Sequence, residues 1–324
     1  MSTTSQLAAG DIPSFAHVIE AHERIAPYIH RTPVLTSQFM NSLAGAELFF
    51  KCENLQKAGA FKARGASNAV FGLTDDQAAN GVATHSSGNH GQSLAYAAGR
   101  RGIPCTVVMP HSAPKAKKDA VAGYGARVVE CEPSIASREE TFAQVLAETG
   151  AEFVHPFNDG RVIAGQGTAA LELFEEVPDL DVIMAPVGGG GLLSGTALTS
   201  LAVSPATRVI AGEPAGADDA YRSLQTGQIQ PSVQPKTIAD GLLTSLGEIT
   251  FAIIRRHVEK ILTVQDETII KAMRLVWERM KIIVEPSAAV PLAALLEHPD
   301  AELRGKRVGI IFSGGNVDLG KLPF

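Results

Sequence analysis

Residues 181–195 read DVIMAPVGGGGLLSG, and this stretch decides the fold class. Its first six residues form an apolar run of strand length, and residues 191–203 carry apolar side chains at helical spacing after the glycines. A buried strand that passes through a glycine loop directly into a helix is typical of one unit of a parallel sheet. We therefore expect further units of this kind along the chain.

The same alternation recurs before and after this stretch. Further strands are predicted at 81–85, 105–110, 126–131, 207–213 and 307–313. Helices are predicted near the N-terminus, with Ser14 as the N-cap, and at 62–78, 89–101, 114–123, 137–149, 164–176, 191–203, 266–281 and 287–297. The alternation predicts a two-lobed α/β fold of mostly parallel, twisted sheets with helices on both faces. In such folds ligands bind at the carboxyl ends of the strands.

Length and composition are those of a large globular protein. The chain has 324 residues, of which 45% are hydrophobic and 19% are charged. Because single cores stop growing near about 250 to 300 residues, we expect two lobes. Residues 51–155 would form a small domain, and residues 1–50 with 156–324 a large domain that binds the ligand.

Charge and cysteine content exclude several classes of partner. The formal net charge of −6 argues against a nucleic-acid groove or a polybasic membrane patch, which both need clustered Lys and Arg. Cys52, Cys105 and Cys131 are widely spaced, so neither a disulfide framework nor a zinc–thiolate site is indicated. The N-terminus lacks a signal-peptide pattern, and no apolar run approaches the ~18 residues of a membrane span. We expect a cytoplasmic protein.

The glycine run Gly188–Gly191 predicts an anion site. Its backbone N–H groups can converge on a phosphate at the positive end of the following helix. A dinucleotide fingerprint that starts at Gly188 would need glycine at position 193, which is leucine, and the P-loop signature is absent. The loop is thus expected to bind one phosphate. A turn that merely permits close packing of strand and helix is the alternative.

Two other loops follow predicted strands. The sequence SSGNHG at 86–91 places hydroxyl, amide and imidazole groups at the start of a helix, which suits a carboxylate, although an ordinary N-cap is an equally good interpretation. Ser313 ends the last strand in SGGNVD, where a serine is commonly only a turn residue.

The stretch AGEPAGADDAY places Glu213, Asp218 and Asp219 around a glycine-containing turn. Carboxylate oxygens at this spacing, completed by a backbone carbonyl, suit a hard cation such as Mg²⁺ or Ca²⁺. Acidic residues that complement a helix dipole are the alternative.

Lys62 lies among small and aromatic neighbours in AGAFKA, at the predicted start of a helix. A surface lysine is the ordinary interpretation. Partial desolvation and the helix dipole would instead lower the pKa of Lys62, and a neutral amine forms a Schiff base with an aldehyde cofactor. A phosphate loop, a reactive lysine and a carboxylate loop together indicate pyridoxal 5′-phosphate acting on an amino acid.

Six motifs also resemble one enzyme family. KAGAFKARGA, SSGNHGQSLAYAA, VIAGQGT, VGGGGLLSG, EPAGADDAY and SGGNVDL are similar, in the same order, to motifs of the fold-type-II pyridoxal-phosphate enzymes (tryptophan synthase β-like) of the serine/threonine dehydratase and serine racemase group. The resemblance implies that Lys62 holds the cofactor and moves the substrate α-proton. It implies cofactor contacts from Phe61, Asn89, Gly188, Gly189, Gly190, Gly191, Leu192 and Ser313.

The resemblance also implies substrate and metal sites. Ser87 would be a catalytic acid/base on the opposite face of the substrate. Substrate contacts are implied for Ser86, Ser87, Asn89, His90 and Arg138, and the pocket wall is expected near Phe157, Asn158 and Gly241. The cation, Mg²⁺, Ca²⁺ or Mn²⁺, would bind Glu213, Asp219 and the carbonyl of Ala217.

The implied reaction is elimination of water from a 3-hydroxy amino acid of the L-serine/L-threonine type, giving a 2-oxo acid and ammonia. The alternatives are serine racemase, threo-3-hydroxyaspartate ammonia-lyase, or action on a bulkier substrate such as phenylserine. A non-catalytic pyridoxal-phosphate carrier or amino-acid sensor is an alternative of another class. The family also implies a homodimer, and without a further C-terminal domain no feedback inhibition by isoleucine is expected.

Overall fold

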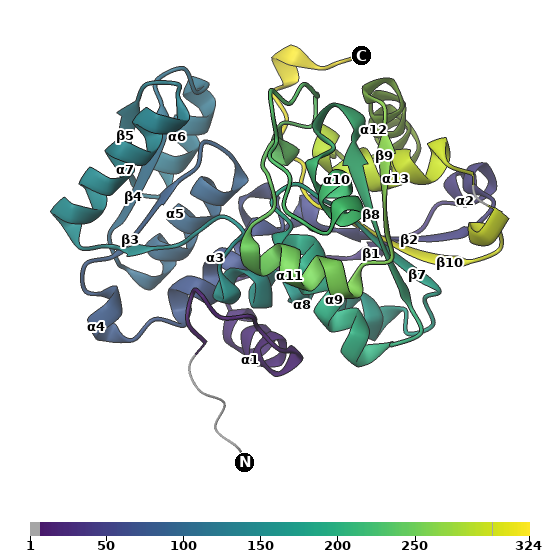
Figure 1. Ribbon diagram of the computed structural model, residues 1–324, viewed down its shortest axis with the longest axis horizontal. Helices are drawn as coiled ribbons and strands as arrows, with labels where there is room; N and C mark the ends of the chain where they lie inside the picture. The colour runs from purple at the N-terminus through teal and green to yellow at the C-terminus, as the bar shows by residue number, and fades with distance from the viewer. Residues whose placement is uncertain (1–6, 300) are drawn as a thin grey trace.

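The computed structural model describes residues 7–299 and 301–324, and it contains two sheets (Figure 1). The larger has six strands in the order β1 (Val34–Leu35), β2 (Glu47–Cys52), β10 (Arg307–Phe312), β7 (Val182–Pro186), β8 (Arg208–Pro214) and β9 (Lys260–Val264). Its pairs are parallel except β1 with β2. The smaller has four parallel strands in the order β5 (Arg127–Cys131), β4 (Cys105–Pro110), β3 (Val82–His85) and β6 (Glu152–Phe153).

Alternate strand residues of the six-stranded sheet enter two different cores. Phe50, Met184 and Ile310 pack in a core with α2 (Gln38–Ala44), α12 (Asp266–Met280) and α13 (Pro286–Glu297). Their neighbours Phe49 and Ile183 pack in a core with α8 (Gly160–Glu176), α9 (Gly191–Val203) and α11 (Glu248–His257). Because both faces are covered, these strands read as continuous apolar runs, and the predicted α/β class is confirmed.

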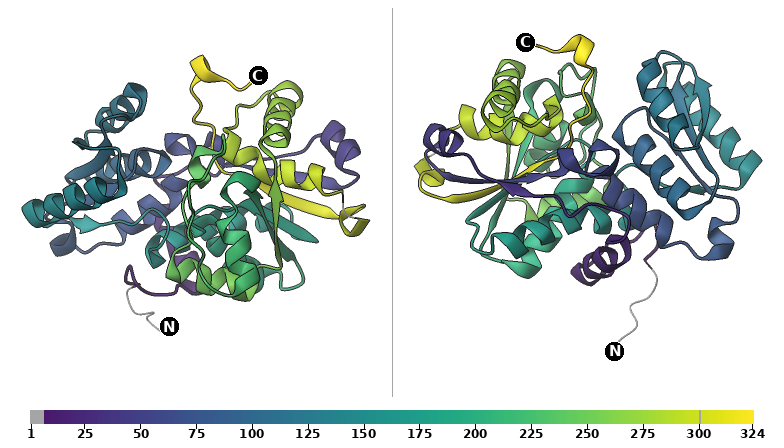
Figure 2. Two further views of the ribbon diagram at one scale, coloured as in Figure 1. Left: turned by 45° about the horizontal axis from the view of Figure 1, so that its top comes forward. Right: turned by 180° about the vertical axis from the view of Figure 1, so that it is seen from behind.

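The four-stranded sheet is likewise covered on both faces, with α4 (Asp75–Ala78), α5 (Asn89–Arg101), α6 (Lys115–Gly123) and α7 (Ile135–Thr149) around it (Figures 1 and 2). Helix α3 (Lys62–Phe71) lies between the two sheets, in contact with α5 on one side and α8 on the other. Strands β3 to β6 fall within residues 51–155, and the predicted domain division stays a prediction.

Several predicted elements differ from those observed. The single helix predicted at 62–78 is two helices, α3 and α4, because Gly72 ends the first and Thr74 caps the second. Helix α8 begins four residues earlier than predicted, with Asp159 accepting a hydrogen bond at its N-cap. The prediction gave no range for β2 and omitted the short strands β1 and β6, the edge strand β9 with its mixed burial, and three helices, α2, α10 (Asp219–Thr226) and α11. Helix α1 (Phe15–Ile25) begins after Ser14, as predicted.

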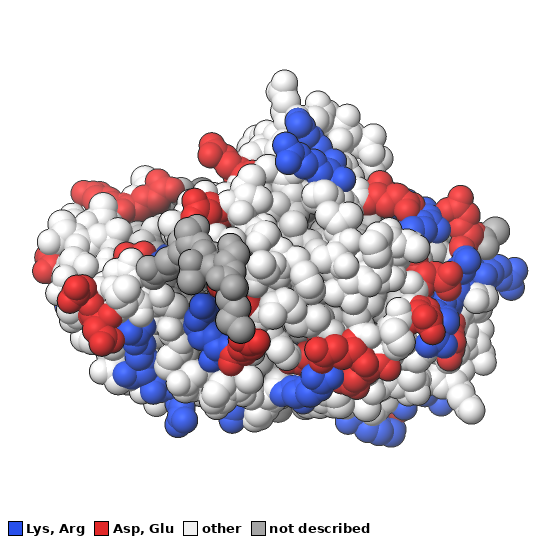
Figure 3. Space-filling view, turned by 90° about the horizontal axis from the view of Figure 1, so that it is seen from below, with Lys and Arg blue, Asp and Glu red and all other residues white. Residues whose placement is uncertain are grey.

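The surface seen from below in Figure 3 has acidic and basic side chains interspersed around a broad uncharged area. Within the described residues, no helix has both the length and the apolar character needed to cross a membrane.

Candidate active site

The start of α3 is held against the end of β10. The Phe61 N–H donates to the Ser313 carbonyl at 2.9 Å, and Ala60 pairs with Gly314 as an isolated bridge. The turn that precedes this contact needs Gly59, because φ is +69° there and a Cβ would lie 2.4 Å from the Asn316 side-chain oxygen. The loop after β10 and the first turn of α3 therefore form one side of the site.

Lys62 is the first residue of α3, and its amine faces the segment that precedes α8. The Nζ atom donates to the Pro156 carbonyl at 2.7 Å and lies 5.1 Å from the centroid of the Phe61 ring. Burial lowers the pKa of Lys62 to about 8, and the Glu285 carboxylate opposes this shift only in part. About a tenth of this amine is therefore neutral at pH 7, far more than for an ordinary lysine.

The buried glycine loop precedes α9. Gly190 is its N-cap with φ +87°, and a Cβ at Gly189 would lie 2.3 Å from the Phe157 ring. The glycines are thus needed for packing, as the alternative interpretation held. They also leave donors free: among the described residues, none accepts a hydrogen bond from the N–H groups of residues 188–192. Free donors at a helix N-terminus fit a phosphate group.

Asn89 begins α5 and is oriented by a residue that the sequence interpretation missed. Its Nδ2 donates to Glu285 Oε1 at 2.9 Å, and its Oδ1 accepts from Asn316 Nδ2 at 2.9 Å. Burial raises the pKa of Glu285 to about 7. Glu285 lies at the N-cap of α13 before Pro286, where an acidic residue is ordinary, so no sequence signal marked it.

His90, in the first turn of α5, has a buried and neutral side chain. Its Nε2 donates to the Val154 carbonyl at 3.0 Å, while its Nδ1 is buried and has no partner among the described residues. Burial lowers the pKa of His90 well below its ordinary value. The free nitrogen is an acceptor, so a bound carboxylate would need the serine hydroxyls and N–H groups of this loop, where the Ser86 Oγ accepts from the Gly88 N–H at 3.3 Å.

Ser87 and Arg138 line one cavity of about 200 Å³, together with Cys131 and Ile135. The Arg138 Nε atom is buried and has no hydrogen-bond partner within the described part of the chain. Gly241 lies elsewhere, beside the glycine loop, since a Cβ on Gly188 would be 3.3 Å from the Gly241 carbonyl oxygen. The structure therefore places Arg138 with Ser87, and Gly241 with the phosphate loop.

The predicted cation ligands lie at the end of β8. Both Glu213 oxygens accept backbone N–H groups, from Ala220 and Tyr221, at 2.8 Å each. Both Asp219 oxygens are buried without a partner among the described residues, and Ala217 ends the turn between the two acids. Burial raises the pKa of Glu213 to about 8 and that of Asp219 to about 6.

This donor set fits a cation. The described residues contain no group of three His, Cys, Asp or Glu side chains that could hold a metal, but the predicted set needs only two carboxylates and one carbonyl. A hard cation would add positive charge beside these buried acids, which the nearby Arg222 stabilises only in part.

Comparison with known proteins identifies the family of this chain. Residues 25–314 match the family model described as pyridoxal-phosphate dependent enzyme. The chain is 60% identical over 313 residues to the β-hydroxyaspartate dehydratase of Paracoccus denitrificans (strain Pd 1222), covering 97% of this chain and 99% of that one. Serine racemase from Dictyostelium discoideum has a similar structure, with a TM-score of 0.92 at 53% identity over 95% of this chain and 100% of that one.

Maize serine racemase is also similar, with a TM-score of 0.94 at 47% identity over 96% of this chain and 95% of that one. These relatives share the chain's length and its α/β architecture, and the predicted family is confirmed. The chain belongs to the fold-type-II pyridoxal-phosphate dependent enzymes, in the family of serine/threonine dehydratases and serine racemases.

Proposed function

We propose that the protein removes water from 3-hydroxyaspartate, giving oxaloacetate and ammonia. The observation that carries this choice of substrate is the cavity shared by Ser87 and Arg138, in which Arg138 has a buried nitrogen without a partner among the described residues. The similar dehydratase of Paracoccus denitrificans carries β-hydroxyaspartate in its name, which supports the same substrate.

The second carboxylate distinguishes 3-hydroxyaspartate from serine and threonine. A guanidinium binds a carboxylate through charge-assisted hydrogen bonds, and an unpaired buried donor disfavours a substrate that cannot satisfy it. At about 200 Å³ the cavity is smaller than sites for drug-sized ligands, and it suits a substrate side chain. The acidic lining residue, Glu132, has a largely exposed side chain that is paired with His111 at 3.1 Å.

Pyridoxal phosphate, when bound, withdraws electrons from the amino acid's α-carbon and so makes its proton removable. Lys62 would hold the cofactor covalently, with Asn89 beside it and the N–H groups of residues 188–192 on its phosphate. Ser313 would face the pyridine nitrogen.

The protein's own groups then move protons and hold the substrate. With a pKa of about 8, Lys62 Nζ is a suitable base for the α-proton near neutral pH. The C3–oxygen bond breaks, and the hydroxyl leaves with a proton as water. The loop at 86–91 holds the α-carboxylate, and Arg138 holds the second carboxylate. A water molecule is taken up again when ammonia is released. The atoms of 3-hydroxyaspartate are therefore all accounted for by oxaloacetate and ammonia.

The test compares substrates in one variant. Arg138→Gln should lower kcat/KM for 3-hydroxyaspartate roughly 10 to 10²-fold, the size of a lost charge-assisted contact, and change kcat/KM for L-serine less than about fivefold. Oxaloacetate and pyruvate are followed with coupled dehydrogenases. Arg127→Gln, at an exposed arginine of β5, is the control and should leave kcat/KM unchanged for both substrates. An equal loss on both substrates in Arg138→Gln would contradict the assignment.

A further inference from the structure

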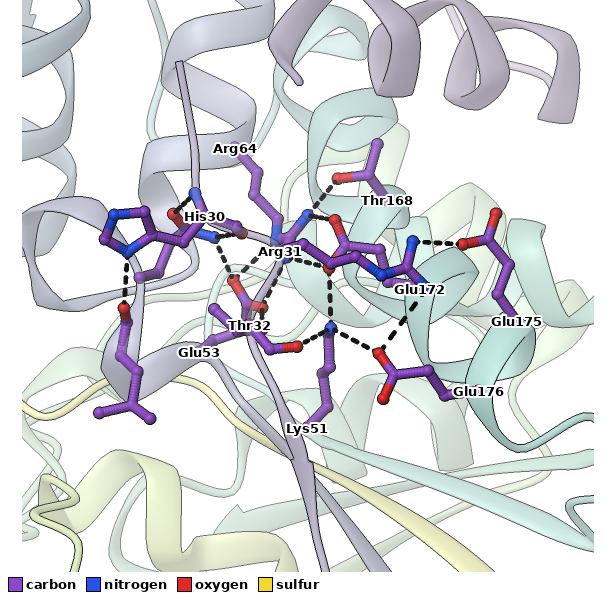
Figure 4. Close-up of polar contacts among 12 residues, drawn as sticks. His30, Arg31, Thr32, Lys51, Glu53, Arg64, Thr168, Glu172, Glu175 and Glu176 are labelled. Carbon is purple, nitrogen blue, oxygen red and sulfur yellow. Dashed lines mark hydrogen bonds and ion pairs between the residues drawn. The ribbon is translucent and has the colours of Figure 1, made fainter. Parts of the chain in front are cut away.

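The charged side chains of Lys51, Glu53, Arg64 and Glu172 lie close together (Figure 4). Lys51, Glu53 and Arg64 are 0% exposed and Glu172 is 2% exposed. Lys51 comes from β2, Glu53 from the short 3-10 helix Glu53–Leu55, Arg64 from α3 and Glu172 from α8, and their charges sum to zero. We call these four residues the buried charge cluster.

Arg64 is the centre of the buried charge cluster. Its Nε and Nη2 donate to the two oxygens of Glu53 at 2.7 and 2.8 Å, and its Nη1 and Nη2 donate to the two oxygens of Glu172 at 2.8 and 2.7 Å. Nη1 also contacts the Thr168 hydroxyl at 3.1 Å. Two bidentate pairs on one planar group fix both its position and its orientation.

The two acids of the cluster are also bound by Lys51 and Thr32. Lys51 Nζ lies 2.7 Å from Glu172 Oε2 and donates to the Thr32 carbonyl at 2.6 Å. The Thr32 hydroxyl donates to Glu53 Oε1 at 2.5 Å. Arg64 therefore cannot shift without moving groups from three other elements.

Stability alone is a poor reason for this arrangement. The cost of desolvating charges commonly cancels their attraction, and apolar side chains of similar volume are often as stabilising. The cluster instead fixes the position and orientation of Arg64 on α3. Such a fixed geometry matters most for a neighbouring residue whose function depends on its exact position.

The buried charge cluster holds α3 at Arg64, which is two residues after Lys62. Successive helix residues are about 100° apart, so the side chains of Lys62 and Arg64 leave α3 on nearly opposite sides. Lys62 turns toward Pro156 and the site, while Arg64 turns into the cluster. The next residue, Gly65, lies against Gly165 of α8, where a Cβ would be 2.6 Å from the Gly65 Cα, so α3 and α8 are in close contact at this point.

We propose that Arg64 is a positioning residue for Lys62, which sets the rotation of the first turn of α3 and thereby the place of the amine. This inference rests on the proposed role of Lys62. The lysine amine lies roughly 8 Å from the helix axis, so a rotation of about 7° moves it by roughly 1 Å. A displacement of that size at a reacting group costs up to about 10²-fold in rate.

The test compares both ends of α3. Arg64→Lys keeps the positive charge but loses the planar guanidinium and its two bidentate pairs. Arg101→Lys is the matched control, because Arg101 donates to the Val70 carbonyl at the far end of the same helix and pairs with Asp75. Each apoprotein is titrated with pyridoxal phosphate between pH 6.5 and 9, the absorbance of lysine-linked cofactor is recorded, and the linkage is reduced with borohydride and mapped by mass spectrometry.

For Arg64→Lys we expect cofactor affinity to fall at least about tenfold, the pH midpoint of capture to shift, and kcat to fall at least about tenfold while KM changes less than about threefold. Arg101→Lys should lose thermal stability without these changes. A folded Arg64→Lys with wild-type affinity, midpoint and kcat would overturn the inference. If wild-type protein carries the cofactor on a lysine other than Lys62, the proposed function of Lys62 fails instead.

Thr168→Val keeps the inference testable if Arg64→Lys does not fold. It removes the 3.1 Å contact to Nη1, together with the hydroxyl's own bond to the Gly165 carbonyl within α8 at 2.6 Å, and leaves all four charges in place. Affinity and kcat should fall together by about twofold to fivefold, the size of one lost hydrogen bond. Unchanged values in this variant would also overturn the inference.

Discussion

At the scale of single residues, Lys62 combines a desolvated amine with a backbone carbonyl partner. Because only the neutral amine attacks an aldehyde, and burial lowers the pKa of Lys62 to about 8, capture of pyridoxal phosphate by the apoprotein should rise with pH and level off above about 8. Stopped-flow absorbance measures the rate. Lys62→Ala should abolish capture and turnover, whereas Lys57→Ala should retain both. Capture by Lys62→Ala at the wild-type rate would contradict this role.

Ser87 lines the same cavity as Arg138. The family resemblance implies that Ser87 is the catalytic acid/base on the face of the substrate opposite Lys62. Ser87→Ala should therefore lower racemisation of serine at least about 10²-fold, the usual size of general acid–base catalysis, while dehydration falls less than about tenfold. Chiral chromatography and an oxo-acid assay separate the two activities. Equal losses would show that Ser87 only binds substrate.

At the scale of elements, the packing of the glycine loop leaves no room for side chains. A Cβ at Gly189 would overlap the Phe157 ring, so Gly189→Ala should lower the free energy of unfolding by about 1–3 kcal/mol and weaken cofactor binding. Gly123→Ala is the control, because a methyl group added there, at the end of α6, would have no described atom within 4 Å. Denaturant titration measures stability, and equal effects in the two variants would contradict the argument.

The β8–α10 turn predicts a metal-dependent pH effect. In EDTA, Glu213 and Asp219 have raised pKa values of about 8 and about 6, so the native state holds protons that the unfolded state has released above about pH 4. Their contribution to stability is therefore complete below about pH 4 and is lost as pH rises to about 8.

Bound Mg²⁺ would replace those protons, so the stabilisation that Mg²⁺ confers over EDTA should grow from pH 5 to pH 8. Differential scanning calorimetry measures it as a shift in Tm. The double variant Glu213→Gln with Asp219→Asn is the control and should show no Mg²⁺ effect at any pH. A Mg²⁺ effect that persists in this variant would place the cation elsewhere.

At the scale of the whole molecule, Lys117 of α6 and Asp240 of the turn Asp240–Leu242 join the elements around the two sheets, with 3.0 Å between Nζ and Oδ2. Surface ion pairs contribute only about 0–1 kcal/mol, so Asp240→Asn should leave Tm nearly unchanged. The pair joins α6 to the turn that carries Gly241, beside the glycine loop, so if Arg138 binds substrate as proposed, KM should rise about threefold to fivefold. Asp119→Asn, which breaks a pair within α6, is the control, and an equal rise there would contradict the interpretation.

Much of the fold and of the site was predictable because the signals are local. Apolar runs separated by helical segments predicted the parallel sheets, and the segment 181–195 alone contains strand, loop and helix. Lys62 and the glycine run were recognisable within about ten residues each. Edge strands such as β9 and the helices α10 and α11 were missed because their burial is mixed and tertiary packing decides them. The homodimer and the cytoplasmic location stay predictions.

The sequence by itself determined the α/β class and the family, and it predicted a reactive lysine and a phosphate-binding glycine loop. The tertiary structure decided which side chains meet: Asn89 bonds Glu285 across 196 positions, and Arg64 bonds Glu172 across 108. Periodicity and turn chemistry act over a few residues, whereas these contacts depend on strand order, in which β10 lies between β2 and β7. That order places the last strand beside the start of α3, and with it Ser313 beside Phe61.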